Sequence, residues 1–162
     1  RREPCVMTKR DPINPTDDEA RALALSLLNG TRFGALAVTH PDTQTPYVAR
    51  VAMIWEDGTL FTLISTLSTH TKALQQVPQC AALIGEPGAK GDPLTHPRMT
   101  VMAQAHLADK AAMKDRWLAA IPKAQLYYDF SDFLLFRLAV QSIDLNGGFG
   151  KAFKLGPDDL RS

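Results

Sequence analysis

The chain has 162 residues, of which 45% are hydrophobic, and its formal net charge at pH 7 is +1. A chain of this length is typically one domain that buries about two-thirds of its surface on folding. The hydrophobic content argues against an intrinsically disordered protein. The near-zero net charge argues against a nucleic-acid-binding protein that relies on a basic electrostatic field.

Cysteine content and hydropathy indicate the compartment. Two cysteines, Cys5 and Cys80, are too few for a disulfide framework, and neither lies in a Cys/His spacing typical of a metal site. We therefore expect no metal and a reducing compartment, which predicts a cytoplasmic protein. No apolar stretch approaches the roughly 18 residues that cross a bilayer, and the start Arg1-Arg2-Glu3 leads into no apolar signal segment.

The first predicted elements are an arm and a helix. Residues 1–15 carry three prolines and mixed charges, so we expect a flexible N-terminal arm, followed by one domain over residues 16–162. Thr16 and Glu19 have the spacing of a capping box, which predicts a helix over residues 17–29 that ends at Gly30.

Beyond Gly30 the hydrophobic period changes from 3.6 to 2, which is typical of strands. Helices are expected at Thr69–Val77 and Asp109–Ile121, with a further turn or two over residues 124–129. The predicted strands are Phe33–Thr39, Pro46–Trp55, Thr59–Ser65, Gln79–Gly85, Arg98–Leu107 and Asp132–Leu145, the last broken by residues 147–150. Meander order favours a mainly β protein, a closed or partly closed six-stranded antiparallel barrel with peripheral helices.

The segment from Ser65 to Leu74 is rich in hydroxyl side chains and also carries His70 and Lys72. It follows a predicted strand and runs into a helix N-terminus, a combination of amides, hydroxyls and a cation that suits a phosphate group. An ordinary helix cap explains the same hydroxyls. Arg50, within an apolar strand, either faces solvent or holds an anion, which could be the same phosphate.

The remaining motifs give weaker indications of function. Residues 85–92 contain glycines and a lysine but lack the Gly-Lys-Ser/Thr of a Walker motif, so we interpret them as a surface connection. No two histidines have metal-ligand spacing, and no residue stands out as a general acid or base; the four histidines are His40, His70, His96 and His106.

Several pieces in order resemble one family. They are Val-Ala-Arg-Val-Ala (48–52), Leu-Ile-Ser-Thr-Leu-Ser-Thr-His-Thr-Lys-Ala-Leu (63–74), Ala-Ala-Leu-Ile-Gly-Glu-Pro (81–87), Asp-Pro-Leu (92–94), Pro-Arg-Met-Thr-Val (97–101), Asp-Phe-Leu-Leu-Phe-Arg-Leu (132–138) and Gly-Gly-Phe-Gly-Lys-Ala (147–152). This order is similar to the pyridoxamine 5'-phosphate oxidase-like, FMN-binding split-barrel family, and most of all to its haem-utilisation branch. The likeness covers about residues 17–160.

The resemblance implies a six-stranded split barrel that forms a homodimer, with FMN in a groove at the interface. It places the backbone of Val51 and Ala52 along the isoalloxazine ring. The residues that it assigns to the ribityl phosphate are Arg50, Ser65, Thr66, Leu67, His70, Thr71 and Lys72.

The chain also departs from the family pattern. The Arg-Leu-x-Pro run of the pyridoxamine oxidases is absent, with Arg137-Leu138-Ala139-Val140 in its place, so pyridoxine phosphate is not the expected substrate. The sequence also shows no C-terminal tail with the histidine that binds haem iron in haem-degrading members. We therefore expect an FMN-dependent oxidoreductase of unknown substrate. The alternatives are a haem-binding or haem-degrading protein and a flavin-binding module without turnover.

Overall fold

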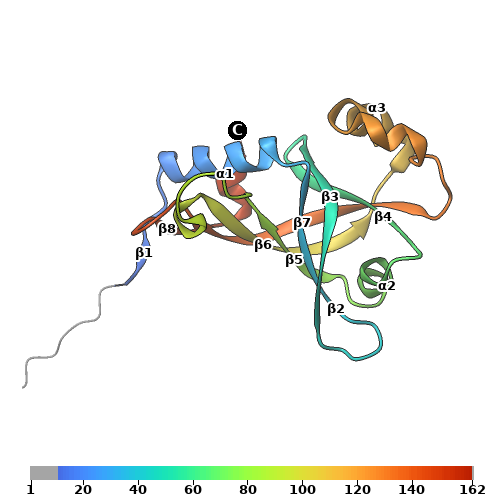
Figure 1. The fold of residues 1–162 in the computed structure, drawn as a ribbon, viewed down its shortest axis with the longest axis horizontal. Helices are drawn as coiled ribbons and strands as arrows, with labels where there is room; N and C mark the ends of the chain where they lie inside the picture. The colour runs from blue at the N-terminus through green and yellow to red at the C-terminus, as the bar shows by residue number, and fades with distance from the viewer. Residues whose placement is uncertain (1–10, 162) are drawn as a thin grey trace, which may run out of the picture.

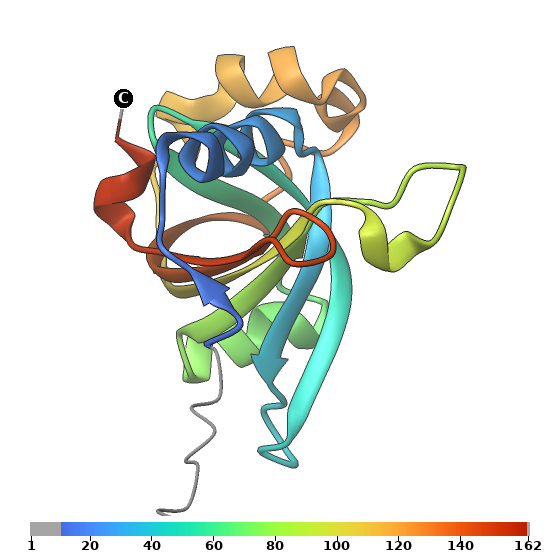
Figure 2. The same cartoon turned by 90° about the vertical axis from the view of Figure 1, so that its left-hand side faces the viewer.

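The computed structural model describes residues 11–161. Six antiparallel strands close into a barrel in the order β7-β4-β3-β2-β5-β6, and β6 pairs back onto β7 (Figures 1 and 2). The barrel strands are β2 (Phe33–Thr39), β3 (Pro46–Glu56), β4 (Thr59–Ser65), β5 (Gln79–Ile84), β6 (Arg98–Leu107) and β7 (Phe133–Asn146).

Two short strands extend the sheet beyond the barrel. β8 (Ala152–Leu155) pairs antiparallel with the end of β7, and β1 (Ile13–Asn14) pairs parallel with β8. The helices are α1 (Asp18–Gly30), α2 (Thr69–Gln76) and α3 (Lys110–Ala120), with 3₁₀ segments at Pro93–Thr95, Pro122–Leu126 and Pro157–Leu160. No helix within residues 11–161 is long and apolar enough to cross a membrane.

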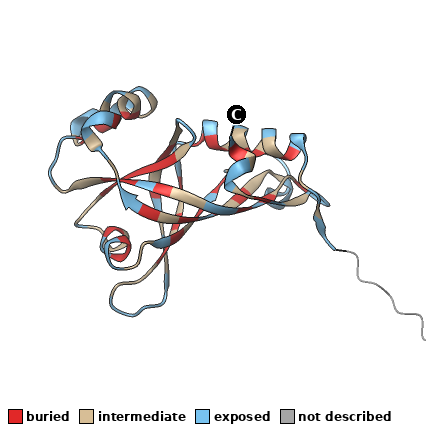
Figure 3. Ribbon diagram, turned by 180° about the vertical axis from the view of Figure 1, so that it is seen from behind, coloured by how far each residue is buried: buried red, intermediate tan, exposed pale blue. Residues whose placement is uncertain are grey.

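Alternating burial along the strands forms the core. In β5, for example, Cys80, Ala82 and Ile84 point into the barrel while the residues between them are partly or fully exposed. Figure 3 shows this alternation as buried and exposed bands along the strands. This is the period-2 pattern expected of a sheet with one covered face. A second apolar cluster, centred on Trp117 and Tyr128, packs α3 and the segment after it onto the outside of the barrel.

α1 runs along the barrel and buries Ala24 and Leu28 against it (Figure 1). Its N-cap is Asp17, whose carboxylate accepts from the Ala20 amide at 2.8 Å. The predicted cap at Thr16 is therefore wrong by one residue. Thr16 instead donates its hydroxyl hydrogen to the Lys154 carbonyl at 2.5 Å, which ties the helix start to β8.

The predicted barrel and its six strands are confirmed, with ends that shift by a residue or so. The sequence analysis missed β1 and β8, which are too short to show a period. Residues 147–150 do interrupt the sheet after β7, and the chain then returns as β8. The helical turns expected at residues 124–129 form instead as a 3₁₀ segment at Pro122–Leu126. Of the predicted arm, residues 1–10 lie outside the described residues, and Ile13–Asn14 is strand.

Cys80 should be chemically inert in the folded protein. Its side chain lies in the barrel core, and burial raises the pKa of the thiol to about 11, so almost no thiolate exists at neutral pH. In a Cys5→Ser background, we expect a maleimide to leave Cys80 unlabelled at pH 7 and to label it fully in denaturant, as read by mass spectrometry. Rapid labelling of the native protein would contradict this placement.

Candidate functional site

The barrel opens between β3 and β4. The two strands pair from Glu56↔Thr59 to Met53↔Thr62, after which β3 pairs only with β2 and β4 pairs only with β7. At the point of parting, the buried Thr62 hydroxyl donates to the Ala52 carbonyl at 2.7 Å and takes the place of the next ladder bond. The backbone of β3 from Pro46 to Ala52 therefore has one edge without a strand partner, and such an edge can accept a ligand.

The N-terminus of α2 follows directly after the end of β4. Its N-cap, Ser68, makes no side-chain capping bond, whereas α1 and α3 are each capped by an aspartate. Among the described residues, the amides of Thr69, His70 and Thr71 have no hydrogen-bond partner. A helix start with free amides carries a partial positive charge and attracts anions.

The turn between β4 and α2 is braced by Asp132. The Ser65 hydroxyl donates to the Asp132 carboxylate at 2.7 Å and accepts from the Leu67 amide at 3.1 Å. The Thr66 amide donates to the Asp132 backbone carbonyl at 2.7 Å. Ser65 thus holds the turn in shape and its hydroxyl is not a free donor. The sequence analysis missed Asp132, because this contact joins residues 67 positions apart and leaves no local pattern.

Other predicted residues sit in the first turn of α2. Thr71 is fully buried, and its hydroxyl has no hydrogen-bond partner within the described part of the chain. Lys72 is exposed, as is the side chain of Leu67 just before the helix. His70 is half-buried, and burial lowers the pKa of its imidazole, so the ring is neutral at pH 7 and adds no charge.

Arg50 lies on the outer face of β3, at the strand edge that parts from β4. The sheet register places it on the same face as Ser65. Its guanidinium, however, lies over the Phe33 ring at 5.6 Å and lines a pocket with the loop after β5, at Gly85–Pro87. The structure therefore brings Arg50 to the outer face of the barrel, with its side chain over Phe33 of β2.

Val51 and Ala52 occupy the parting point itself. The Val51 side chain is buried in the barrel core, and Ala52 is partly buried against the cluster around Trp117. Their backbone, rather than their side chains, borders the opening.

The outer face of four neighbouring strands is apolar and exposed. One row runs Val48, Ala37, Ala81 and Met102 across β3, β2, β5 and β6, and the next runs Arg50, Ala35, Leu83 and Thr100. Val48, Leu83 and Met102 each keep 45% or more of their surface exposed. The residues between these three are mostly alanines, whose small side chains make the face flat. Contiguous exposed apolar surface of this kind marks an interaction site.

The histidines differ in what their nitrogens do. His96 is fully engaged: Nδ1 accepts from the Gly88 amide at 2.5 Å and Nε2 lies 2.7 Å from the Lys90 carbonyl. His40 accepts two amides of its own turn at Nδ1. His70 and His106 make no side-chain hydrogen bond with the described residues. Within residues 11–161, no three His, Cys, Asp or Glu side chains gather as a metal site requires.

Comparison with known proteins finds haem-related proteins and proteins with the same barrel fold. No protein-family model matches the chain. It is 34% identical over 102 residues to a non-canonical heme oxygenase, HOZ, chloroplastic, of Arabidopsis thaliana. A heme binding protein of Mycobacterium smegmatis superposes with a TM-score of 0.77 at 25% identity, covering 90% of this chain and 60% of that one. A Clostridium acetobutylicum protein related to general stress protein 26, of the pyridoxinephosphate oxidase family, gives a TM-score of 0.69 at 11% identity, covering 90% and 100%.

The chain spans only part of some of these relatives. The match to the plant protein covers 60% of this chain and 30% of that protein. The barrel and its strand order agree with these likenesses. The chain has the split-barrel fold of its neighbours in the pyridoxamine 5'-phosphate oxidase-like family, and its relatives include a heme oxygenase and a heme binding protein.

Proposed function

We propose that the protein is an FMN-binding flavoprotein of this family, acting as an oxidoreductase on a substrate still to be identified. The flavin would lie along the open edge of β3, with its phosphate at the N-terminus of α2. Bound FMN supplies electron transfer, and the protein supplies binding, orientation and electrostatics. Haem is the alternative cofactor, and a bound flavin that does not turn over is the alternative role.

One observation supports the phosphate most strongly: α2 begins without a side-chain cap. Free amides at Thr69, His70 and Thr71 need an acceptor, and a phosphate has several acceptor oxygens. The unpartnered Thr71 hydroxyl lies in the same turn, and the exposed Lys72 ammonium follows directly. Arg50 reaches the phosphate only if its side chain rotates off Phe33, which an exposed arginine does readily.

Asp132 limits where the phosphate can sit. Its carboxylate holds the Ser65 hydroxyl, and a second anion placed against it would be repelled. The phosphate therefore belongs nearer to Lys72 than to Ser65. The proposal consequently assigns Ser65 to shaping the turn, and the anion contacts to the α2 amides, Lys72 and the rotated Arg50.

We also infer a homodimer that uses the apolar face of β2, β3, β5 and β6. The rows through Leu83 and Val48 leave large side chains in water that a second copy would cover. Arg50 lies within this face, so the face adjoins the proposed flavin site. A partner there would cover a flavin that one barrel alone leaves open.

The haem alternative rests on the heme oxygenase and heme binding protein among the relatives. Of the described histidines, His70 and His106 have ring nitrogens that no hydrogen bond occupies, so either could reach an iron. The absorbance spectrum of purified protein separates the cofactors. The proposal expects flavin bands and an increase in them on adding FMN; a Soret band on adding haem, with no response to FMN, would contradict it.

Lys72→Ala should weaken FMN binding much more than riboflavin binding. The ammonium pairs with the phosphate, which riboflavin lacks, and a charge-assisted hydrogen bond is worth about 1.5–3 kcal/mol. The affinity for FMN should therefore fall about ten- to a hundredfold. Arg50→Ala should behave alike, and Ser65→Ala should cost less. Quenching of flavin fluorescence measures all three.

Lys123→Ala is the matched control, because Lys123 is exposed on the 3₁₀ segment after α3. Removing its charge should leave both affinities as in the wild type. Equal FMN affinity in the wild type and in Lys72→Ala would remove Lys72 from the site. An equal loss for FMN and riboflavin would show that the change does not act through the phosphate.

Leu83→Glu should separate the dimer. Leu83 is 49% exposed in the middle of the apolar face. A glutamate at this position would bury an unpaired carboxylate in the dimer interface, which destabilises the dimer. Light scattering should give about twice 17.8 kDa for the wild type and 17.8 kDa for the variant. Leu126→Glu, at a residue 81% exposed outside this face, should stay dimeric. A monomeric wild type at micromolar concentration would refute the inference.

A further inference from the structure

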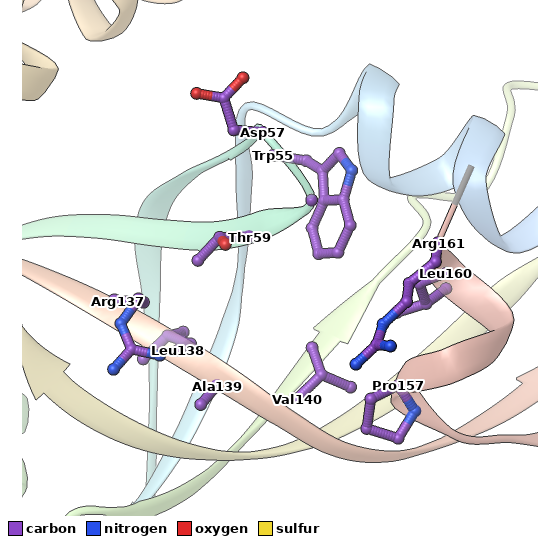
Figure 4. Close-up of a pocket in the computed structure, with 11 residues that line it drawn as sticks. Trp55, Asp57, Thr59, Arg137, Leu138, Ala139, Val140, Pro157, Leu160 and Arg161 are labelled. Atoms are coloured by element: carbon purple, nitrogen blue, oxygen red, sulfur yellow. The ribbon is translucent and has the colours of Figure 1, made fainter.

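A pocket of about 640 Å³ lies away from the β3 opening, at the other end of β4. On one of its edges, β7 pairs with β4 up to Leu138 and with β8 only from Ile143 onward. The backbone of residues 139–142 therefore has no strand partner on that edge. The pocket occupies this gap in the sheet, and Figure 4 shows the residues that line it.

One residue in the gap, Val140, turns both of its backbone hydrogen-bonding groups toward the pocket. In an antiparallel strand the N–H and C=O of one residue point to the same side, and the side alternates along the strand. The Asp132 carbonyl accepts from Thr66 on the β4 side, and the Leu135 carbonyl accepts from Ala108 on the β6 side. Val140 lies an even number of residues after Asp132, and the bulge between β6 and β7 comes only after it. Its N–H and C=O therefore face the side of β4, at a point that β4 does not reach.

These two groups are unpartnered. Within residues 11–161, no turn, loop or side-chain group bonds to the N–H or C=O of Val140, and no strand lies beside them. A donor and an acceptor side by side on a strand edge fit a ligand that offers the complementary acceptor and donor. The open edge spans only residues 139–142, which favours a small molecule over a peptide strand.

The core side of the pocket is apolar and aromatic. Trp55, Leu60 and Leu138 are register partners across β3, β4 and β7, so their side chains share the core face of the sheet. Val140 lies on the same face, and the 3₁₀ segment at Pro157–Leu160 closes the far side (Figure 4). The half-buried Trp55 indole offers a flat surface for another ring. Pockets of roughly 300–1,000 Å³ hold small organic molecules.

The charged residues around the pocket favour an uncharged ligand. Arg137 has Phe61 as its register partner, so its side chain lies on the outer face of the sheet, opposite to the face of Trp55. The other charged residues of the lining, Asp57 and Arg161, each form an ion pair with another side chain of the chain. The groups that a ligand meets beside Trp55 are therefore the apolar wall and the backbone of Val140.

We propose that this gap binds an uncharged, flat heterocycle that carries an N–H donor beside a C=O acceptor, as a cyclic amide does. The amide edge of the heterocycle bonds to the C=O and N–H of Val140, and the face of its ring lies against the Trp55 indole. This site goes beyond the proposed cofactor function and uses none of the residues assigned to FMN, so it holds or fails independently of FMN binding.

The test uses 2-quinolone, which carries N–H and C=O side by side, and 1-methyl-2-quinolone, which lacks the donor. In a nitrogen–hydrogen NMR spectrum of the whole chain, 2-quinolone should move the Val140 amide downfield and shift the Trp55 indole signal, both in a saturable way. The Ala139 amide, which faces β6, and the Trp117 indole, which is fully buried in the α3 cluster, should stay in place. The methylated compound should bind at least about tenfold more weakly, because the Val140 carbonyl loses its donor.

Variants assign the two contacts. Val140→Pro removes the amide donor without breaking a ladder bond, because this N–H faces the gap. It should weaken 2-quinolone binding about tenfold or more. Val140→Ala keeps the N–H and is the matched control, which should bind nearly as the wild type does. Trp55→Leu keeps an apolar side chain but no flat ring, and it should weaken binding several-fold.

Equal binding of the two quinolones, or a Val140 amide that stays in place, would overturn the proposal whether or not Val140→Pro folds. FMN should bind without displacing 2-quinolone, and competition between the two would overturn the assignment of a separate site. Failure of FMN to bind would contradict the proposed function and leave the expected quinolone response unchanged.

Discussion

The structure depends on where two strands of the barrel stop pairing. β3 and β4 form a ladder only as far as Met53↔Thr62, and the Thr62 hydroxyl then closes the ladder on the Ala52 carbonyl. A buried carbonyl without a partner is costly, so this single bond allows the strands to part without penalty. Beyond it, β3 stays with β2 while β4 leads into α2. This parting creates the opening, and the uncapped helix start and the apolar face lie beside it.

The α2 turn shows how a shaping contact and a binding group differ. Asp132 fixes Ser65 and Thr66 through the Ser65 hydroxyl and the Thr66 amide, so both residues belong to the frame of the site. The amides of residues 69–71 remain free, and the proposed function gives them the phosphate. In the proposed function, the few groups at the edge, above all Lys72 and the histidines, select which cofactor binds.

Sequence patterns predicted the barrel because its signals are local. Period-2 alternation in β2 to β7 and turn residues between them are visible within ten residues, and so is the hydroxyl-rich turn from Ser65 onward. The sheet extension β1–β8 was missed because a two-residue strand has no period, and its pairing joins Ile13 to Ala152. The Asp132 brace and the gap in the edge of β7 are likewise products of long-range pairing. The sequence left open whether Arg50 faces solvent or holds an anion; the structure puts it exposed on the outer face, and its direction toward Phe33 depends on side-chain packing that spacing does not encode.

The central claim is that the uncapped start of α2 holds the phosphate of a flavin. The most direct measurement is the NMR response of the backbone amides of Thr69, His70 and Thr71 to FMN and to riboflavin. The account predicts that FMN moves these three amides downfield, as hydrogen bonds to a phosphate do, while riboflavin leaves them near their free positions. Shifts of the same size with both flavins, or FMN-induced shifts confined to other parts of the barrel, would contradict it.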